Sequence, residues 1–437
     1  MKRVAVIGSG IAGLTAARRL SVEAPVTLFE SAERFGGHSH TVDVVIDGVR
    51  HGVDTGFLVF NDRTYPGLIR LFAELGVATA ASDMSFSVRR RGDGLEWSGR
   101  TLDAVFAQRR NLVRPAFWRM LGDIARFNRL TTAMAQPQAA TGLAALDQPI
   151  GEFLDQHRFS ASFRDGYFLP MVGCIWSCPT RQMLSFPMAT MIRFCHNHGL
   201  LQVTDRPQWR TVVGGSRNYV ERMLAAIDDR RLGVPVRRLR RVPEGVEVTT
   251  EHGGSETFSA VVVACHSDQA LALLADPTPD ERAVLGAIGY QRNRAVLHTD
   301  RDLLPRRRRA WAAWNYESTA ASDHEGRPVC LHYLINHLQP LPFETPVLVS
   351  LNPLTEPDPR CVQGEFDYAH PVFDRAALAA QARLPALQGR GGIWYGGAWT
   401  GYGFHEDGLT SGLAAAEGVL AAWAARGHDA DRTLEAA

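Results

Sequence analysis

The feature that most constrains the fold is the segment GSGIAG at residues 8–13. It follows an apolar, β-branched run over residues 4–7 that is typical of a buried parallel strand, and it precedes a stretch with helical spacing. In this setting Gly8 permits a tight turn, Gly10 lets the backbone approach a diphosphate, and Gly13 lets the helix lie close to the strand. The helix N-terminus favours an anion through its free N–H groups and its dipole. The segment therefore predicts a dinucleotide-binding βαβ unit.

A second strand and the residues after it narrow the choice of dinucleotide. Residues 26–29 are apolar and end in Glu30, at the roughly 20-residue spacing where a carboxylate can bind the ribose hydroxyls. No arginine stands at the end of this strand, which favours an adenosine without a 2′-phosphate. The following sequence SAERFGGH, residues 31–38, resembles the extended fingerprint of flavoproteins, in which the chain passes the diphosphate of FAD. We therefore predict FAD as the cofactor.

Length and composition predict two domains and exclude some classes of protein. A chain of 437 residues is too long for a single hydrophobic core, so we expect two domains. It is 45% hydrophobic, and its formal net charge of +1 lacks the basic excess of a nucleic-acid binder. No apolar run reaches the about 18 residues of a membrane span. The six cysteines are scattered and no export signal precedes them, so we expect reduced thiols and a cytoplasmic location.

The composition changes at residue 83, where the chain becomes more aromatic, more basic and mostly helical in pattern. We predict an α/β protein in which a Rossmann-like FAD-binding domain, a parallel sheet with a β-meander, carries an inserted mixed α+β substrate domain. The FAD-binding domain is assigned residues 1–82, 207–265 and 390–437, and the substrate domain residues 83–206 and 266–389.

Only one dinucleotide site is visible in the sequence. Gly214-Gly215 lacks the spacing and the acidic residue of a second site. A flavin reductase with its own NAD(P)H usually has two such sites, so electrons are expected to pass to oxygen, a quinone or another acceptor, or the reaction is redox-neutral. Further on, the runs at residues 246–250 and 257–265 predict a β-hairpin joined by Gly253-Gly254.

Residues 109–130 have the pattern of an amphipathic helix, with several arginines beside Phe117 and Trp118. Such a helix can lie at an anionic membrane surface, and the run RRRRAWAAW at residues 306–314 has the same character. In the alternative interpretation the aromatic side chains pack into their own domain and the arginines face water. Peripheral contact with the inner membrane therefore stays open alongside a purely cytoplasmic location.

A group of thiols and imidazoles suggests a metal, but we predict none. Cys174, Cys178, Cys195, His196 and His198 lie close together in the sequence. The C-x3-C spacing is not that of a zinc knuckle, and free cysteine behaves as a small apolar residue. The surrounding side chains instead suggest the walls of an apolar cavity: Phe168, Leu169, Met171, Phe186, Met188 and Phe194.

The C-terminal segment at residues 393–412 predicts a strand, a glycine-rich turn and the start of a helix over Leu413–Trp423. Such a helix start would direct N–H groups at a reduced flavin. Loss of hydride from carbon also needs a base to take a proton. The candidates are His405, Glu406, His196 and His198, with His405 placed first because it precedes Gly408; His405 and Glu406 could instead simply cap the helix.

Together these segments resemble the flavin amine oxidase and phytoene desaturase superfamily from end to end. The stretches GGHSHT, VDTGFLVFNDRTYP, FCHNHGLLQ, RPQWRTVVGGSRNYV and YGFHEDG are similar to a bacterial group of amine-oxidase-like proteins found beside lipid methyltransferases. Some members are implicated in desaturating methylated fatty acyl chains. The resemblance implies an apolar small-molecule or acyl-lipid substrate and a lipid methyltransferase as a partner.

The resemblance also implies which residues contact FAD. The diphosphate and adenosine are implied to contact residues of the first βαβ unit and of a later strand, namely Gly8, Ser9, Gly10, Ala12, Gly13, Glu30, Ser31 and Val236. The ribityl region falls to Arg34, Gly37 and His38. The flavin ring system falls to residues from two distant segments, namely Thr55, Gly56, Phe57, Gly397, Gly408 and Leu409.

Two departures from the family pattern bear on the reaction. Ala398 stands where many relatives have a carboxylate, and lysine occurs only at Lys2, so the lysine that holds a water over the flavin in amine oxidases is missing. We therefore expect an FAD-dependent oxidoreductase, a desaturase that removes hydride from an unsaturated or methyl-branched fatty acyl chain. A flavin-dependent double-bond isomerase, an FAD-binding accessory protein of a methyltransferase and an amine oxidase remain as alternatives.

Overall fold

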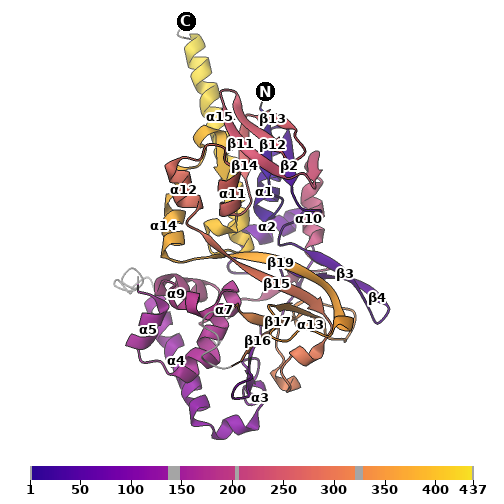
Figure 1. Ribbon diagram of the computed structural model, residues 1–437, viewed down its shortest axis with the longest axis vertical. Coiled ribbons are helices and arrows are strands. Elements are labelled where there is room, and N and C mark those ends of the chain that lie inside the picture. The colour runs from indigo at the N-terminus through magenta and orange to yellow at the C-terminus, as the bar shows by residue number, and fades with distance from the viewer. Residues whose placement is uncertain (1, 136–147, 202–205, 320–327, 436–437) are drawn as a thin grey trace.

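A five-stranded parallel sheet forms the centre of the upper half of the computed structural model (Figure 1), which describes residues 2–135, 148–201, 206–319 and 328–435. All four neighbouring pairs in this sheet are parallel. In spatial order its strands are β10 (Asp229–Leu232), β2 (Val26–Glu30), β1 (Val4–Ile7), β14 (Ala260–Val263) and β20 (Ile393–Tyr395). The α/β class predicted from the sequence is confirmed.

The alternation of side chains along β1 explains why the sheet is covered on both faces. Val4 and Val6 belong to the core that contains α1 (Ile11–Leu20) and α15 (His405–Glu435). Ala5 and Ile7 point the other way, into a core shared with the meander β11 (Val236–Val242), β12 (Gly245–Thr250) and β13 (Ser255–Phe258). A parallel strand buried on both faces reads as a continuous apolar run, as the sequence does here.

The predicted hairpin forms, but its second run divides. Residues 255–258 pair with β12 as β13, whereas residues 260–263 form the central parallel strand β14. The break falls at Ser259, whose N–H donates to Arg3 O at 3.0 Å and whose Oγ accepts from Arg3 N at 2.9 Å. The helix predicted over Leu413–Trp423 also differs, since α15 begins at His405.

Three short helices inside the range predicted for the substrate domain pack elsewhere. These are α11 (Ser267–Leu273), α12 (Pro279–Leu285) and α14 (Arg375–Arg383), whose apolar side chains join the core that contains Ala5 and Val261. The upper half therefore extends beyond the boundary predicted at residue 266. It also contains α2 (Pro66–Leu75) and α10 (Arg217–Leu224).

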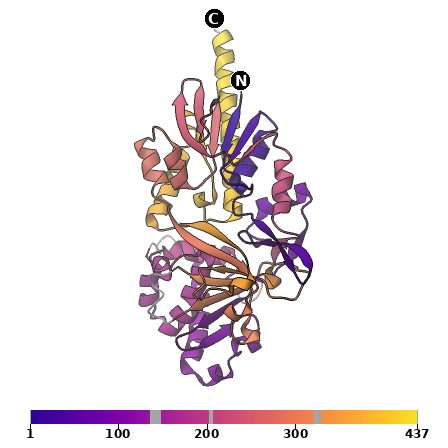
Figure 2. The ribbon, with the colours of Figure 1, turned by 45° about the vertical axis from the view of Figure 1, so that its right-hand side comes forward.

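A seven-stranded mixed sheet organises the lower half, and its long strands β15 and β19 cross the waist between the halves (Figure 1, Figure 2). In order it comprises β19 (Val362–Val372), β15 (Gly289–His298), β18 (Leu348–Leu351), β17 (Cys330–Leu334), β16 (Trp314–Ser318), β7 (Phe86–Arg90) and β8 (Leu95–Ser98). Smaller sheets pair β3 (Thr41–Ile46) with β4 (Val49–Asp54), and β5 (Phe60–Asn61) and β6 (Thr79–Ala81) with β9 (Trp209–Val212).

Helices cover the lower sheet and build an aromatic core beside it (Figure 1). The aromatic core is built by α4 (Pro115–Ala135), α5 (Ile150–Gln156), α6 (Ala161–Phe163), α7 (Leu169–Trp176), α8 (Thr180–Leu184) and α9 (Met188–Asn197). The helices α3 (Leu102–Val105) and α13 (Ile335–Leu338) instead pack against the core of the lower sheet.

The amphipathic helix predicted over residues 109–130 is a 3₁₀ turn, η1 (Arg109–Val113), followed by α4. Its Phe117 and Phe127 are buried in their own domain, whereas Trp118 is exposed. In the described part of the chain, no helix combines the length and apolar character needed to cross a membrane.

Candidate active site

A cavity of about 1000 Å³ lies between the two halves of the molecule. One part of its lining comes from the glycine turn after β1 and from the ends of β2 and β14, and another from α7, α9 and the strands β15 and β19. In open α/β sheets, ligands bind outside the carboxyl ends of the strands. The cavity occupies this position and continues into the lower half.

Most of the residues predicted to contact the cofactor come together here although they are dispersed in the sequence. Those that line the cavity are Gly8, Ser9, Gly10, Ala12, Glu30, Ser31, Arg34, Gly37, His38, Gly56, Phe57, Val236 and Gly397. Four predicted residues are not part of the lining: Gly13, Thr55, Gly408 and Leu409.

The glycines outside the lining serve close packing of the backbone. A Cβ on Gly13 would lie 1.8 Å from Gly8 O, and one on Gly408 would lie 2.7 Å from Ile11 Cγ2. Leu409 is buried in the core between α1 and α15. These three positions hold the strand and the two helices together behind the cavity. Thr55 also lies behind the cavity, where its Oγ1 shares a hydrogen bond of 2.7 Å with Tyr368 OH.

Gly56 lines the cavity, but its nearest neighbour is protein. A Cβ there would lie 2.3 Å from His38 O, so the glycine is required by the passing backbone of His38. The assignment of Gly56 to the flavin ring system stays a prediction, since the contact that requires glycine here is made within the chain.

Glu30 anchors the glycine turn. Its Oε2 accepts hydrogen bonds from Ser9 N at 2.9 Å and Ser9 Oγ at 2.5 Å, and its Oε1 accepts from Ala32 N at 2.9 Å. Its Oε1 also accepts a long hydrogen bond from Ser31 Oγ at 3.5 Å. An ionised carboxylate has about four acceptor sites, so a ribose hydroxyl would bind in place of this longest bond. Glu30 therefore both fixes the turn and faces the cavity.

Three features of the cavity fit FAD. Nothing lies within 4 Å of a Cβ placed on Gly10, so only a ligand would meet a side chain there. Arg34 Nη1 and His38 Nε2 are buried with no hydrogen-bond partner, an arrangement that native proteins rarely leave unsatisfied. Gly10 would admit the diphosphate, and Arg34 and His38 would supply hydrogen bonds beside it.

Several lining residues escaped the sequence analysis. Ala264, Cys265 and His266 follow β14, and Tyr290 and His370 come from the long strands β15 and β19. The first three directly follow an apolar run, which is the signal for the carboxyl end of a parallel strand. The last two alternate along strands of a different sheet and gave no such signal.

Apolar and aromatic side chains dominate the lower part of the cavity. The lining there includes Met84, Phe86, Met171, Cys174, Ile175, Trp176, Phe194, Leu200, Trp209, Trp314 and Phe373. Of the six residues predicted as cavity walls, Met171 and Phe194 occupy that place. Phe168, Phe186 and Met188 are buried in the aromatic core, and Leu169 packs against it. Such a lining favours a long apolar ligand.

His198 is held in this lower part with a defined tautomer. It follows α9, and its Nδ1 donates to Phe194 O at 3.0 Å because a carbonyl can only accept. The ring stacks on Phe194 with centroids 3.9 Å apart. Burial lowers the pKa of His198 to about 4, so Nε2 is an unprotonated acceptor at neutral pH. His196, two residues earlier in the last turn of α9, is not part of the cavity lining.

His405 lies at the upper end of the cavity and is engaged by the protein. Its Nε2 is 2.9 Å from Ser39 Oγ and 3.2 Å from Tyr219 OH, and its ring stacks on Phe57 with centroids 3.7 Å apart. Burial lowers the pKa of His405 to about 3. Among the four candidates for the base, His405 and His198 reach the cavity.

Glu406 has a structural task. Its two carboxylate oxygens accept from Gly67 N at 2.7 Å and Leu68 N at 2.9 Å. These N–H groups belong to the first turn of α2, where a carboxylate satisfies free donors and the helix dipole. Glu406 is not part of the cavity lining.

One group of described residues has the side chains and spacing of a metal site: Glu317, Cys330 and His332. Glu317 is already bidentate with Arg91, at 2.7 and 2.9 Å. Burial opposes its charge, but hydrogen bonds from His332 and Arg91 lower the pKa of Glu317 to about 2. The group is therefore a buried ion-pair network. Cys174, Cys178 and Cys195 are separate buried thiols.

The neutral histidines of the cavity predict a dependence of stability on pH. Burial is the main cause that lowers the pKa of His198 and His370 to about 4 and that of His405 to about 3, against about 6.5 in an unfolded chain. Between these values the unfolded state binds more protons. The stability contributed by these histidines is therefore complete above pH 6.5 and is lost as the pH falls toward about 4. Asp54 and Asp407, whose pKa values burial raises to about 6, offset part of this loss.

This prediction is checked by thermal unfolding of the cofactor-free protein at several pH values from 8 to 4.5. Each pKa unit corresponds to about 1.4 kcal/mol per group, so the Tm should fall by several degrees below pH 6.5. His405→Gln should reduce the slope, whereas the same change at exposed His252 should not. A constant Tm across this range would contradict the prediction.

The fold and the cavity together define a flavin-binding oxidoreductase architecture: a parallel sheet with a glycine turn, a meander, and a second domain over the crevice. The chain belongs to the flavin containing amine oxidoreductase family, whose model matches residues 11–344. This membership confirms the superfamily and the flavin cofactor predicted from the sequence, and the dinucleotide turn makes FAD the flavin that fits.

Three known proteins illustrate the similarity. AofH of Mycobacterium tuberculosis, named as a flavin-containing monoamine oxidase, is 28% identical over 284 residues, which cover 63% of this chain and 59% of AofH. The chain thus spans about three fifths of that relative. A putrescine oxidase has 17% identity, covers 96% of this chain and 99% of its own, and has a TM-score of 0.66. A CLA-producing fatty acid isomerase from P. acnes has 15% identity, covers 94% and 97%, and has a TM-score of 0.62. At these identities the two structures indicate the fold alone.

Proposed function

We propose that the protein is an FAD-dependent oxidoreductase that desaturates a long apolar substrate, an unsaturated or methyl-branched fatty acyl chain. The observation that carries the proposal is the composition of the lower cavity, where aromatic and aliphatic side chains from α7, α9 and β16 surround a space continuous with the cofactor residues. A flexible apolar chain fills such a space and is shielded from water there.

FAD, when bound, supplies an acceptor for the hydride that leaves the substrate carbon. The chain's own residues contribute the remaining parts of the reaction. Apolar walls such as Met171 and Trp314 orient the acyl chain and exclude water, and Nε2 of His198 accepts the proton from the neighbouring carbon. An allylic position, next to an existing double bond, makes both hydrogens easier to remove.

Amine oxidation is disfavoured by the position of the single lysine. Lys2 Nζ lies 5.4 Å from the ring of Trp423, in the outer part of the upper half, and is not part of the cavity lining. A lysine is thus missing from the place where amine oxidases of this superfamily use one. Because the similar proteins include a putrescine oxidase and AofH, which is named as a monoamine oxidase, amines are the substrates against which lipids should be compared.

The test is an anaerobic titration of the FAD-loaded protein with a phospholipid that carries a methyl-branched, unsaturated acyl chain. We expect the visible flavin absorbance to bleach as two electrons leave the lipid, and a panel of primary amines to leave it unchanged. Bleaching by the amines alone would overturn the proposal.

A second candidate is a double-bond isomerase, which returns the hydride to the same chain. It is favoured by the single dinucleotide motif and by the fatty acid isomerase among the similar folds. In the same titration it would shift the double bond without lasting bleaching. Bound lipid with neither change would favour an accessory role beside a lipid methyltransferase, a partner that stays a prediction from the sequence resemblance.

A further inference from the structure

Four exposed apolar side chains gather at one pole of the lower half. Leu102 and Val113 are each 82% exposed, Trp118 is 50% exposed and Leu112 is 47% exposed. They belong to α3, η1 and the first turn of α4, which Figure 1 places at the pole opposite the chain ends. We call these four residues the apolar tip.

The apolar tip is held rigidly. Trp118 Nε1 donates to Leu112 O at 2.9 Å, and its ring packs against Phe106 with centroids 5.4 Å apart. Phe106 in turn packs edge-on against the buried Phe117 at 5.8 Å. The exposure of Trp118 is therefore fixed by the fold, and little conformational freedom is lost when a partner covers it.

Basic side chains surround the apolar tip. Arg109, Arg110, Arg114 and Arg119 flank the tip residues in the chain. Arg309, which follows Arg308, reaches Asp103 in α3 at 3.3 Å. Two carboxylates pair with them, Asp103 with Arg109 and Arg309, and Asp93 with Arg114. The chain as a whole has a formal net charge of only +1, so positive charge is concentrated at this pole.

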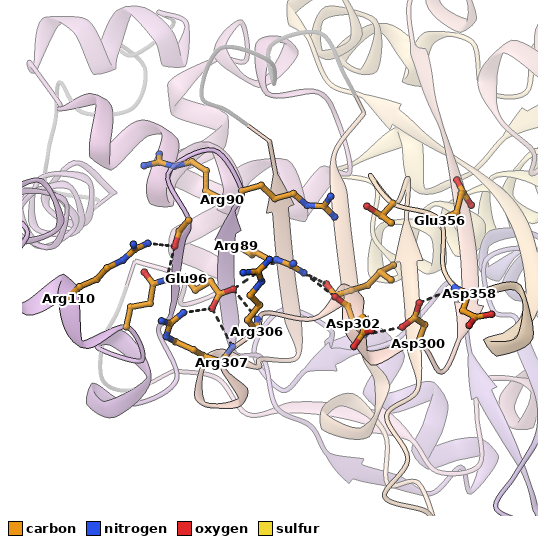
Figure 3. A pocket seen from close by; sticks show the side chains of 15 residues that line it. Arg89, Arg90, Glu96, Arg110, Asp300, Asp302, Arg306, Arg307, Glu356 and Asp358 are labelled. Carbon is orange, nitrogen blue, oxygen red and sulfur yellow. Dashed lines mark hydrogen bonds and ion pairs between the residues drawn. The ribbon is translucent and has the colours of Figure 1, made fainter.

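A polar groove of about 840 Å³ begins beside the apolar tip, and its lining changes from mainly basic to acidic along its length. Arg110 lines it, and Figure 3 shows arginines at that end and Asp300, Asp302, Glu356 and Asp358 at the other. At the basic end Arg110 Nη2 donates to the carbonyls of Gly94 and Asp93. An anionic surface is thus attracted at the tip and repelled further along the groove.

We propose that the apolar tip and its arginines form a docking face for an anionic phospholipid bilayer. Aliphatic and tryptophan side chains inserted at the level of the headgroups, with arginines around them, are the combination that binds proteins to such surfaces. A bilayer suits the tip better than a protein partner, since four side chains on a convex pole offer too little area for a stable protein interface. The proposal is independent of turnover, because vesicle binding is measured without a reaction.

The test is co-sedimentation of the FAD-loaded full chain with vesicles of phosphatidylcholine, alone or with roughly one third phosphatidylglycerol. We expect binding at least about tenfold stronger to the anionic vesicles, weakening as salt screens the arginines. The double variant L102S/V113S should lose about tenfold or more of this binding, since both side chains project into solvent and their loss leaves the core intact.

The matched control is V22S/V45S, which replaces side chains that are 77% and 64% exposed in other parts of the molecule. It should bind vesicles like the parent protein. Equal binding to both kinds of vesicle, equal loss in both double variants, or retained binding in L102S/V113S would each overturn the proposal. A dimer in sedimentation equilibrium that L102S/V113S abolishes would overturn it too, by assigning the face to a second copy of the chain.

Discussion

Gly10→Ala is expected to weaken FAD binding by about 100-fold, which corresponds to roughly 2.7 kcal/mol. The reason is that the protein itself leaves room for the new methyl group, since nothing lies within 4 Å of a Cβ at this position. The backbone of Gly10 is ordinary for any residue, with φ −65° and ψ 177°. The methyl group would therefore collide only with the ligand, at the place where the diphosphate meets the start of α1.

The measurement is a titration of the cofactor-free protein with FAD, followed by thermal unfolding with and without it. The Tm of the cofactor-free variant should be close to that of the parent protein, because replacing a glycine N-cap by alanine costs about 1 kcal/mol or less. The stabilisation by FAD should fall at a fixed FAD concentration.

Gly122→Ala is the matched control, because its Cβ also meets nothing within 4 Å but the residue lies in the interior of α4, in the lower half. It should bind FAD normally and gain up to about 1 kcal/mol of helix stability. Unchanged FAD affinity in Gly10→Ala would show that the diphosphate lies elsewhere.

The sequence was sufficient for the nucleotide half wherever local chemistry determines the structure. The apolar strand β1, the turn at Gly8 and the carboxylate of Glu30 all belong to one βαβ unit. Their spacing in the sequence is therefore enough to predict how they are arranged around a dinucleotide. Local spacing could not predict which atoms lie beside each glycine. Gly10 borders open space, whereas a Cβ on Gly56 would collide with His38 O and one on Gly408 with Ile11. These contacts are made by segments distant in the chain.

The lower half was harder to predict because its site is assembled from several segments. Tyr290 and His370 reach the cavity from β15 and β19, whose alternation looks the same whether one face meets water or a ligand. The division of residues 255–263 into two strands likewise depends on Ser259 meeting Arg3. Long-range pairings of this kind leave no local pattern.

The histidine candidates show the same limit. In the sequence, His405 is the attractive base because it precedes a helix at the flavin, yet its Nε2 is occupied by Ser39 and Tyr219. His198 Nδ1 donates to Phe194 O and the residue lines the cavity, so Nε2 is the nitrogen that could accept a proton there. Which nitrogen remains free depends on packing partners that the sequence does not reveal.

His198→Asn is expected to lower the rate of flavin reduction by lipid substrate by about 100-fold or more, the usual effect of losing a general base. FAD content and Tm should stay near those of the parent protein. The left-handed position that ends α9 is occupied by Gly199, with φ 65°, and not by His198, with φ −84°. The substitution therefore leaves the helix end intact while removing the basic nitrogen. His196→Asn is the matched control, since His196 lies in the same turn but not in the lining of the cavity.

The pH profile separates a base from a mere helix cap. With the pKa of His198 lowered to about 4 by burial, the ring is neutral and competent above that value. The rate constant for flavin reduction should therefore be constant from pH 8 down to about 5 and fall as the ring gains a proton near pH 4. Single-turnover measurements in this range, made in short pH jumps to avoid acid unfolding, should lose this acidic limb in His198→Asn. Parent-like rates in His198→Asn, or an equal loss in His196→Asn, would show that the proton goes to another acceptor, and His405→Asn would then be the variant to measure.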